Sequence, residues 1–483
     1  MTAEVVVMNK TAVALAADSA ASIRTAHGVK VYAANKLFRL SPSLPVGVLV
    51  YGSSEFMGVP WEVLIREFRA GFGSKSLRHL KDYAVKFMQF LKRQSWLQDE
   101  GYSRLVAASE MSNYLDWLVR DLDRQLQQDF AQGSPPAGDD AGKQHTLEEL
   151  LKAKFDELGK VALDRVRRER DRLSQFPKFD ELSEEAEKKI HQDFSEDVRT
   201  IVGRILAASA ILKLVPPQEE LQEALCRAAL FPLTRQPPTE LSSGLVFAGY
   251  GRDDVFPSTH AMSFRGILAG SLQKKVDEHR SLGISRENSA TVIGFAQDDM
   301  IGTFMHGADP SLQNRWWETF RKFVEKIPDT VSQALQGSAV VGADTIVEAL
   351  RAYLSQAGEA LLSEAQQAQR EDHTIPFIQS VSFLSKDEMA ELAESLIRLT
   401  SLKRRVTMTE ETVGGPIDVA VISRGEGFVY VKRKHYFDRK LNPYYGQKSP
   451  EPTHEPKKRK KTERTASTAK GRHARPRKRK QAD

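Results

Sequence analysis

The second residue of the chain is a threonine, a residue type that supports an uncommon kind of catalysis when it stands at a free N-terminus. Methionine aminopeptidase removes Met1 readily when the next residue is small, so Thr2 could become terminal. Its hydroxyl would then act as nucleophile, and its own α-amine, with a pKa of about 7.7–8.0, would accept the proton. Many inert proteins also begin Met-Thr, so the residues that follow must show whether Thr2 is catalytic.

Three further residues stand where they could serve such a threonine. Asp18 follows Thr2 by sixteen residues and ends an apolar run, Lys36 precedes the pattern Leu-Phe-Arg-Leu, and Gly52 ends another apolar run. Each also has a purely structural interpretation. Asp18 could cap a turn, Gly52 could relieve a tight turn, and Lys36 could lie on a solvated strand face, with Lys30 as the rival lysine.

The first fifty residues have the pattern of β-strands, and a helix is expected at 61–68 after Pro60. The expected strands are the short apolar or alternating runs 3–8, 12–17, 29–33, 37–40 and 46–51. From 75 to 240 the pattern is helical and charged, with a Gly/Pro-rich loop at 132–142.

Strand character returns after residue 240. The expected strands are 244–250, 261–268, 290–295, 417–422 and 427–432, the last two forming a hairpin after a Gly414-Gly415 turn. The expected helices are 311–336, 347–368 and 385–402, the last with Ser385 and Glu388 as a capping box. Adjacent Trp316 and Trp317 fit packing or an interface. This order predicts an α+β layered fold and not a doubly wound parallel sheet.

Composition places the chain among globular proteins and excludes several classes. Of 483 residues, 41% are hydrophobic and 28% charged. The sequence has neither an apolar run long enough to span a membrane nor a signal-peptide core, so we expect a cytoplasmic protein without membrane contact. Cys226 is the single cysteine, in an apolar helical stretch, and is expected to be buried. Scattered histidines lack metal-ligand spacing, so we expect neither a metal nor a cofactor.

The positive charge is concentrated in a C-terminal segment. Residues 455–483 hold thirteen Lys or Arg and three acidic residues, a net charge of +10, which leaves −4 for the remainder of a chain whose total is +6. We expect a disordered tail from 439 to 483. The tail could serve only to keep the chain in solution, or its basic clusters could bind nucleic acid or an acidic partner. Such binding would lack sequence specificity, because no aromatic residue stands among the clusters.

Two separated stretches resemble the proteasome β-subunit and HslV family of N-terminal threonine hydrolases. The first contains Thr2, Asp18 in Ala-Ala-Asp-Ser, and Lys36 heading Lys-Leu-Phe-Arg-Leu. The second, residues 414–429, is similar to the closing hairpin of a proteasomal β-subunit. The resemblance implies an αββα N-terminal nucleophile (Ntn) fold formed by 2–74 and 241–438, with 75–240 as a helical insertion.

The resemblance also implies roles. Thr2 would be nucleophile and base, Lys36 would ease loss of the hydroxyl proton and keep the amine neutral, Asp18 would orient Lys36, and Gly52 would stabilise the oxyanion. The family's Asp-x-x-Ser before the Gly-Gly turn is altered here. Glu410 replaces the aspartate and a valine replaces the serine, with Thr412 as a neighbouring hydroxyl.

The favoured function is therefore a threonine peptidase that cleaves peptides or proteins, in a homo-oligomeric ring as the family implies. Two alternatives remain open. One is an interaction protein that uses the fold as a scaffold and binds through the helical module and the basic tail. The other is an amidohydrolase that acts on small amides.

Overall fold

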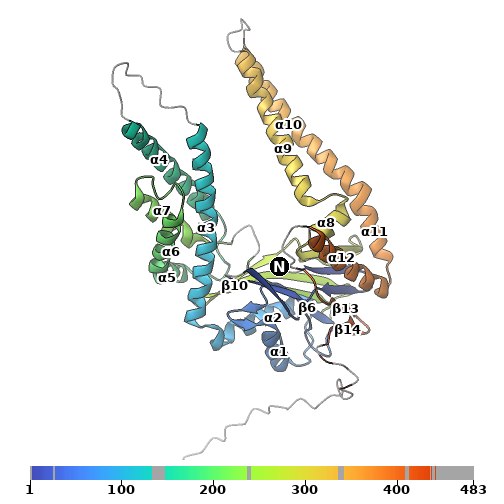
Figure 1. Ribbon diagram of the computed structural model, residues 1–483. Helices are drawn as coiled ribbons and strands as arrows, with labels where there is room; N and C mark the ends of the chain where they lie inside the picture. Colours follow the sequence, from blue (N-terminus) through green and yellow to red (C-terminus); the bar gives the residue numbers. More distant parts are fainter. Residues whose placement is uncertain are drawn as a thin grey trace, which may run out of the picture. The chain divides into compact units, whose positions relative to one another are not determined.

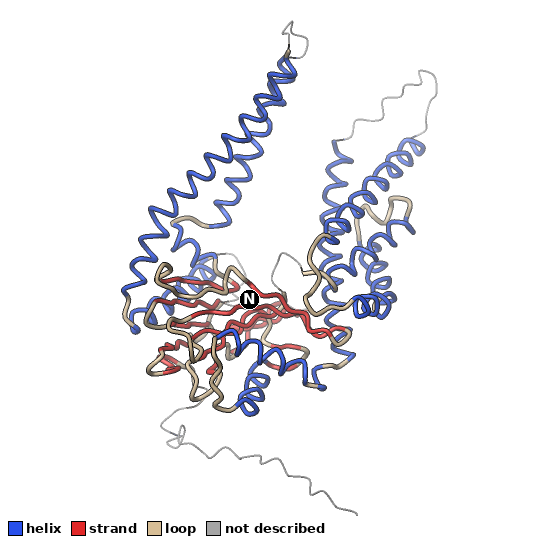
Figure 2. The backbone as a smooth tube through the Cα atoms, turned by 180° about the vertical axis from the view of Figure 1, so that it is seen from behind, coloured by secondary structure: helices blue, strands red, loops and turns tan. Residues whose placement is uncertain are grey.

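Two five-stranded antiparallel sheets lie at the centre of the computed structural model (Figures 1 and 2). The structure describes residues 3–25, 28–132, 147–236, 241–335, 342–407 and 413–435, with Phe437 and Leu441. The first sheet has the strand order β12 (Ala290–Ala296), β1 (Ala3–Asn9), β2 (Val13–Ala17), β13 (Asp418–Ser423) and β14 (Gly427–Lys432). The second has the order β11 (Ser271–Asp277), β10 (Ser258–Leu268), β9 (Ser243–Gly249), β6 (Val46–Gly52) and β5 (Leu37–Arg39).

The side-chain alternation along each strand explains why the sheets stack. In β1, Val6 and Met8 face the second sheet, while Val5 and Val7 face the helices on the other side. In β6, Leu49 packs between the sheets and its neighbours pack outward. Because both faces of these strands are buried, the strands are apolar on both sides, as the continuous apolar runs predict.

Helices cover the outer face of each sheet. Helices α1 (Trp61–Phe72) and α2 (Leu80–Arg93) pack on the second sheet. Helices α8 (Asp299–His306), α11 (Ile375–Phe383) and α12 (Lys386–Val406) pack on the first. The layers therefore run helix, sheet, sheet, helix, and the predicted mixed class of helices and antiparallel strands is confirmed.

Two small hairpins lie beside the sheets. They are β3 (Ala20–Thr25) with β4 (Gly28–Ala33), and β7 (Glu55–Phe56) with β8 (Val59–Pro60). The sequence predicts β4 but not β3, because the short polar run after Asp18 has no apolar alternation. The predicted strand 29–33 thus pairs locally with the chain before it and joins neither large sheet.

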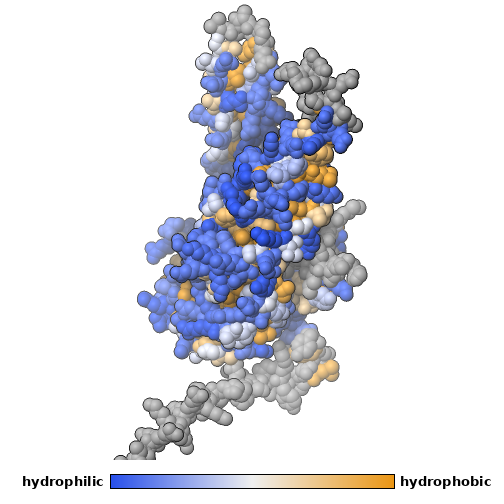
Figure 3. All heavy atoms as spheres, turned by 90° about the vertical axis from the view of Figure 1, so that its left-hand side faces the viewer, coloured by the Kyte–Doolittle hydropathy of each residue, from blue (hydrophilic) through white to orange (hydrophobic). Residues whose placement is uncertain are grey.

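A helical module packs beside the second sheet. It consists of α3 (Glu100–Gln132), α4 (Leu147–Ser174), α5 (Glu184–Asp193), α6 (Ser195–Ala208) and α7 (Gln218–Leu230). The view of this side in Figure 3 is mostly hydrophilic, with scattered hydrophobic side chains. Cys226 is buried in it, as predicted. The range 75–240 begins too early for this module, because α2 buries Tyr83 and Phe87 against the sheet.

A second helical element is a long hairpin. Helices α9 (Pro310–Leu335) and α10 (Ala343–Gln369) run side by side, and a π-helical turn (Arg370–Thr374) joins α10 to α11 (Figure 1). Both helices were predicted, with ends within four residues of those observed. Short helices α8 and α11 were not predicted, since eight or nine residues show little periodicity.

The chain divides into the units Met1–Lys434 and His435–Asp483. Several predicted features fall outside the described residues: Thr2, Glu410, Thr412, and the tail 439–483 apart from Leu441. Within the described part of the chain, every helix is too short or too polar to cross a membrane.

Candidate active site

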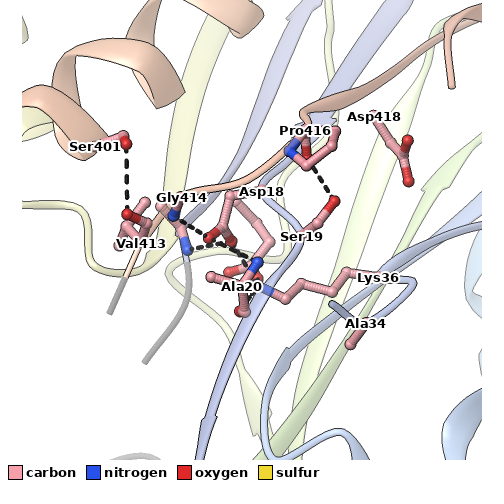
Figure 4. A network of polar contacts seen from close by, with 12 residues as sticks. Asp18, Ser19, Ala20, Ala34, Lys36, Ser401, Val413, Gly414, Pro416 and Asp418 are labelled. Carbon is pink, nitrogen blue, oxygen red and sulfur yellow. Dashed lines mark hydrogen bonds and ion pairs between the residues drawn. The ribbon is translucent and has the colours of Figure 1, made fainter. Parts of the chain in front are cut away.

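The carboxylate of Asp18, directly after β2, accepts four hydrogen bonds (Figure 4). Its Oδ1 accepts from the backbone N–H of Ala3 at 3.1 Å and from Lys36 Nζ at 2.5 Å. Its Oδ2 accepts from the N–H groups of Ala20 at 3.2 Å and Gly414 at 3.0 Å. Asp18 therefore joins β1, the β2–β3 junction, Lys36 and the turn before β13. It is more than the cap of a single turn.

Lys36 is buried, with 4% of its side chain exposed. Besides Asp18, its ammonium donates to the carbonyl of Ala20 at 2.6 Å and lies 3.7 Å from Oε1 of Glu4, a fully buried carboxylate. The rival lysine, Lys30, is exposed on β4. Of the two lysines weighed from the sequence, the structure places Lys36 beside Asp18.

Gly52 is the last residue of β6, the strand that bonds to the Lys36 backbone. The N–H of Val50, two residues earlier, donates to the carbonyl of Lys36 at 2.8 Å. Gly52 has φ +74°, and a Cβ there would lie 2.6 Å from the carbonyl oxygen of Ser242. The position thus requires glycine for two independent reasons, conformation and space.

The backbone at Ala3 is held from both sides. The N–H of Asp18 donates to the Ala3 carbonyl at 3.2 Å, and Ala3 also pairs with Ala296 at the end of β12. Ala296 has φ +59°, a left-handed conformation that an alanine rarely adopts. The residue preceding Ala3 is Thr2. Its own placement lies outside the described residues, but the chain leading to it is fixed at Ala3.

A second lysine lies beside this centre. Lys434, after β14, donates to the hydroxyl of Ser19 at 2.6 Å and to the carbonyl of Ala34. Ser19 in turn donates to the carbonyl of Pro416 at 2.5 Å. The backbone N–H of Lys434 donates to Asp418 at 2.8 Å. Burial lowers the pKa of Lys434, the Lys36 ammonium lowers it further, and Asp418 opposes both effects.

Cavities flank the Gly414–Pro416 turn on two sides. One, of about 470 Å³, is lined by Asp18 together with α12 and Lys432. The other, of about 360 Å³, is lined by Ser19, Tyr32 and the same turn. The carboxylate that holds Lys36 therefore borders space large enough for part of a peptide, and the turn separates the two cavities.

The structure thus brings Asp18 and Lys36 into contact and places Gly52 at the end of the strand that anchors Lys36. It does not describe Thr2, Glu410 or Thr412. The sequence reasoning missed Glu4, Ser19 and Lys434. Glu4 had a usable signal, since it is a charged residue inside the apolar run of β1. Lys434 had none, because its partner Ser19 is more than four hundred residues away in the sequence.

Among the described residues, no group of three or more His, Cys, Asp or Glu side chains could hold a metal ion. No family model and no curated protein matches the chain. Among solved structures it is similar to the (Gly-1) mutant of Anbu from Hyphomicrobium sp. strain MC1, at 8% identity over 92% of this chain and 94% of that one. The TM-score is 0.24, which is too low to relate the two folds.

Proposed function

We propose that this protein is an N-terminal threonine peptidase with a proteasome-like Ntn fold. One observation carries the proposal. The carboxylate of Asp18 binds both the ammonium of Lys36 and the N–H of Ala3, the residue that follows Thr2. A buried cation is thereby held close to the chain position where the nucleophile would begin.

The chemistry follows from these groups. With Met1 removed, the Thr2 hydroxyl attacks the carbonyl carbon of a peptide bond, and its proton passes to the α-amine. The positive potential of Lys36 favours the alkoxide and disfavours a second cation at the amine. The C–N bond then breaks, the leaving amine takes the proton, and water hydrolyses the acyl-threonine. Gly52 is the proposed oxyanion donor, since lack of a side chain lets a substrate approach.

The layer order supports the same proposal. Helix, sheet, sheet, helix is the arrangement expected of an Ntn hydrolase, with the site at one end of the stacked sheets. We also propose peptide or protein substrates and a homo-oligomeric ring. For residues 455–483 we propose non-specific contact with nucleic acid or an acidic partner, on the basis of their charge alone.

Two measurements test the peptidase. Intact-mass analysis should show loss of Met1 with an unmodified Thr2, and a retained Met1 or an acetylated threonine would exclude the mechanism. Cleavage of fluorogenic peptides should fall by at least about 10³-fold in Thr2→Ala, because the nucleophile is removed. Thr200→Ala, an exposed threonine on α6, is the matched control and should retain activity. Equal activity in both variants would contradict the proposal.

A further inference from the structure

The α9–α10 hairpin is antiparallel and has a defined register. Asp329 on α9 pairs with Arg351 on α10 at 2.7 Å, and Gln313 bonds Gln369 near the other end. In both pairs the residue numbers sum to about 681. A residue on α9 and its counterpart on α10 therefore lie at the same height along the hairpin when their numbers have this sum.

One broad face of the hairpin is polar. A groove of about 530 Å³ runs between the helices there, and its rim carries Arg321, Glu325 and Asp329 from α9 with Arg351 and Glu359 from α10. On each helix the less exposed residues form a stripe, here called the packing stripe: Gln313, Trp317, Phe320, Val324 and Pro328 on α9, and Val347, Leu350, Leu354, Gly358 and Leu362 on α10. Each of the five charged residues follows a residue of the packing stripe by one position in the sequence. This face is thus suited to contact with solvent.

The opposite face carries large apolar side chains that are exposed. The residues are Leu312 (48% exposed), Trp316 (65%), Phe323 (64%), Ile346 (50%), Tyr353 (67%) and Leu361 (50%). All six precede, by one position, a residue of the packing stripe: Gln313, Trp317, Val324, Val347, Leu354 and Leu362. In two antiparallel helices, the position before the packed residue falls on the same broad face of both. The apolar side chains therefore form one continuous surface, here called the apolar face.

The helices alone do not bury even their packing stripe well. Trp317, Phe320 and Val324 on α9 are only partly buried, and Pro328 is the one described α9 residue that is fully buried. A two-helix layer with a second apolar face is the usual half of a four-helix bundle. Soluble proteins rarely leave a contiguous surface of this kind uncovered.

We propose that the apolar face binds the apolar face of a second copy of this chain, forming a four-helix bundle with α9 of one copy against α10 of the other. The available area is sufficient. A 26-residue helix is about 39 Å long and two helices are about 20 Å wide, giving about 780 Å² per partner, against about 800 Å² in a standard stable interface.

Charge selects which helices meet. Helix α9 carries four basic and three acidic side chains, whereas α10 carries one basic and four acidic. Beside the apolar face, α9 presents Arg315, Lys322 and Lys326. Contact between two α9 helices would bring these cations together, which is unfavourable. A two-fold axis parallel to the helices avoids this by placing α9 opposite the partner's α10. Arg315 then lies at the height of Glu364.

Side-chain size is complementary in the same arrangement. On α9 the large residues Trp316 and Phe323 lie in the half nearest the sheets, and at their heights α10 has the small residues Ala365 and Gly358, with Leu361 between them. In the far half the sizes reverse, with Tyr353 on α10 opposite Thr330 on α9. Large side chains of one copy thus meet small ones of the other, as interdigitated packing requires.

The first test is the mass of the full-length chain in solution, by light scattering over a range of concentrations. The variant Trp316→Glu/Phe323→Glu should have half the mass of the wild type, because the substituted side chains are exposed and only the contact between copies is lost. Arg321→Ala/Glu359→Ala, on the polar face, is the control and should keep the wild-type mass. Equal masses for wild type and the glutamate variant at every concentration would overturn the proposal.

The second test uses disulfides and does not depend on a destabilised variant. Native Cys226 is buried, so each variant adds one accessible thiol. Chains with Thr330→Cys and chains with Tyr353→Cys, co-expressed and mildly oxidised, should form a disulfide-linked dimer. Each variant alone should remain unlinked, since the two-fold axis places the introduced cysteines of the two copies diagonally across the four-helix bundle. A dimer from Thr330→Cys alone, or none from the mixture, would contradict the arrangement.

Discussion

The ammonium of Lys434 donates a hydrogen bond to the hydroxyl of Ser19 at 2.6 Å, and Ser19 passes a hydrogen bond of 2.5 Å to the carbonyl of Pro416. The chain after β14 is thereby tied to the residue beside Asp18 and to the turn that lies between the two cavities. Lys434 does not touch Asp18 itself. It fixes the segments that carry the donors of Asp18.

This contact predicts a dependence of stability on pH. Burial, the largest cause, lowers the pKa of Lys434 in the folded protein below its ordinary 10.5. At pH values between the folded-state pKa of Lys434 and 10.5, Lys434 is protonated in the unfolded chain more often than in the folded protein. The unfolding free energy therefore rises with pH in this range. Lys434→Met should remove this rise. Urea unfolding from about pH 7 to about pH 10.5 measures it. Lys386→Met, which removes an exposed ion pair with Glu426, is the control, and equal slopes in wild type and Lys434→Met would contradict the assignment.

The pair of Asp18 and Lys36 predicts a strong energetic coupling. Asp18→Asn leaves the Lys36 ammonium buried without its nearest anion, and we expect a loss of about 3–5 kcal/mol in unfolding free energy. The variant Asp18→Asn/Lys36→Met should lose less than the sum of the two single variants by at least about 1 kcal/mol, because the second substitution also removes the ammonium that Asp18→Asn leaves without its nearest anion. Urea denaturation of the four proteins gives the coupling. Additive losses would mean that the ion pair contributes little.

Local patterns in the sequence predict a helix end or a hairpin well where the residues of that one segment determine it. The capping box of α12 is present, with the N–H of Ser385 donating to Glu388 at 2.8 Å. The closing hairpin was predicted at 417–422 and 427–432 and lies at 418–423 and 427–432. Turn glycines, a capping box and short apolar runs determine such elements without help from the rest of the chain.

The remainder depends on distant contacts that no local pattern contains. β3 forms because β4 pairs with it, although its own residues alternate poorly. Helix α2 belongs to the sheet because Phe87 contacts Phe247, more than 150 residues away. In the candidate site, spacing alone left Lys30 and Lys36 as rivals. The ion pair of Lys36 with Asp18 and the bond from the Val50 N–H to the Lys36 carbonyl separate them, whereas Lys30 is exposed.

The backbone conformation and close packing of Gly52 predict that the protein loses stability when a side chain is added there. Gly52→Ala would combine a positive φ with a Cβ 2.6 Å from the Ser242 carbonyl, and we expect a cost of about 1–3 kcal/mol. Gly71→Ala is the matched control, because it lies in α1 with nothing within 4 Å of the added Cβ, and it should gain about 0.5–1 kcal/mol. Thermal unfolding compares the two. A neutral Gly52→Ala would show that the β6 end relaxes freely.

The last prediction concerns the attachment of the helical module to the second sheet. Arg265 on β10 is buried, with its Nε 3.3 Å from Glu110 of α3 and its guanidinium 5.3 Å from the ring of Phe179. Burial lowers the pKa of Arg265, and the Glu110 carboxylate opposes this shift. Removing the carboxylate alone therefore leaves a desolvated cation.

Glu110→Ala should cost about 3 kcal/mol, because the buried guanidinium loses its counter-ion. Glu110→Leu/Arg265→Met should cost less than that, since it replaces both charges with apolar groups of similar size. Limited proteolysis should show earlier cleavage within α3–α7 in Glu110→Ala and near-wild-type resistance in the double variant. If the double variant is the more sensitive, the hydrogen bond from Arg265 to the carbonyl of Pro232 holds the module, and the ion pair does not.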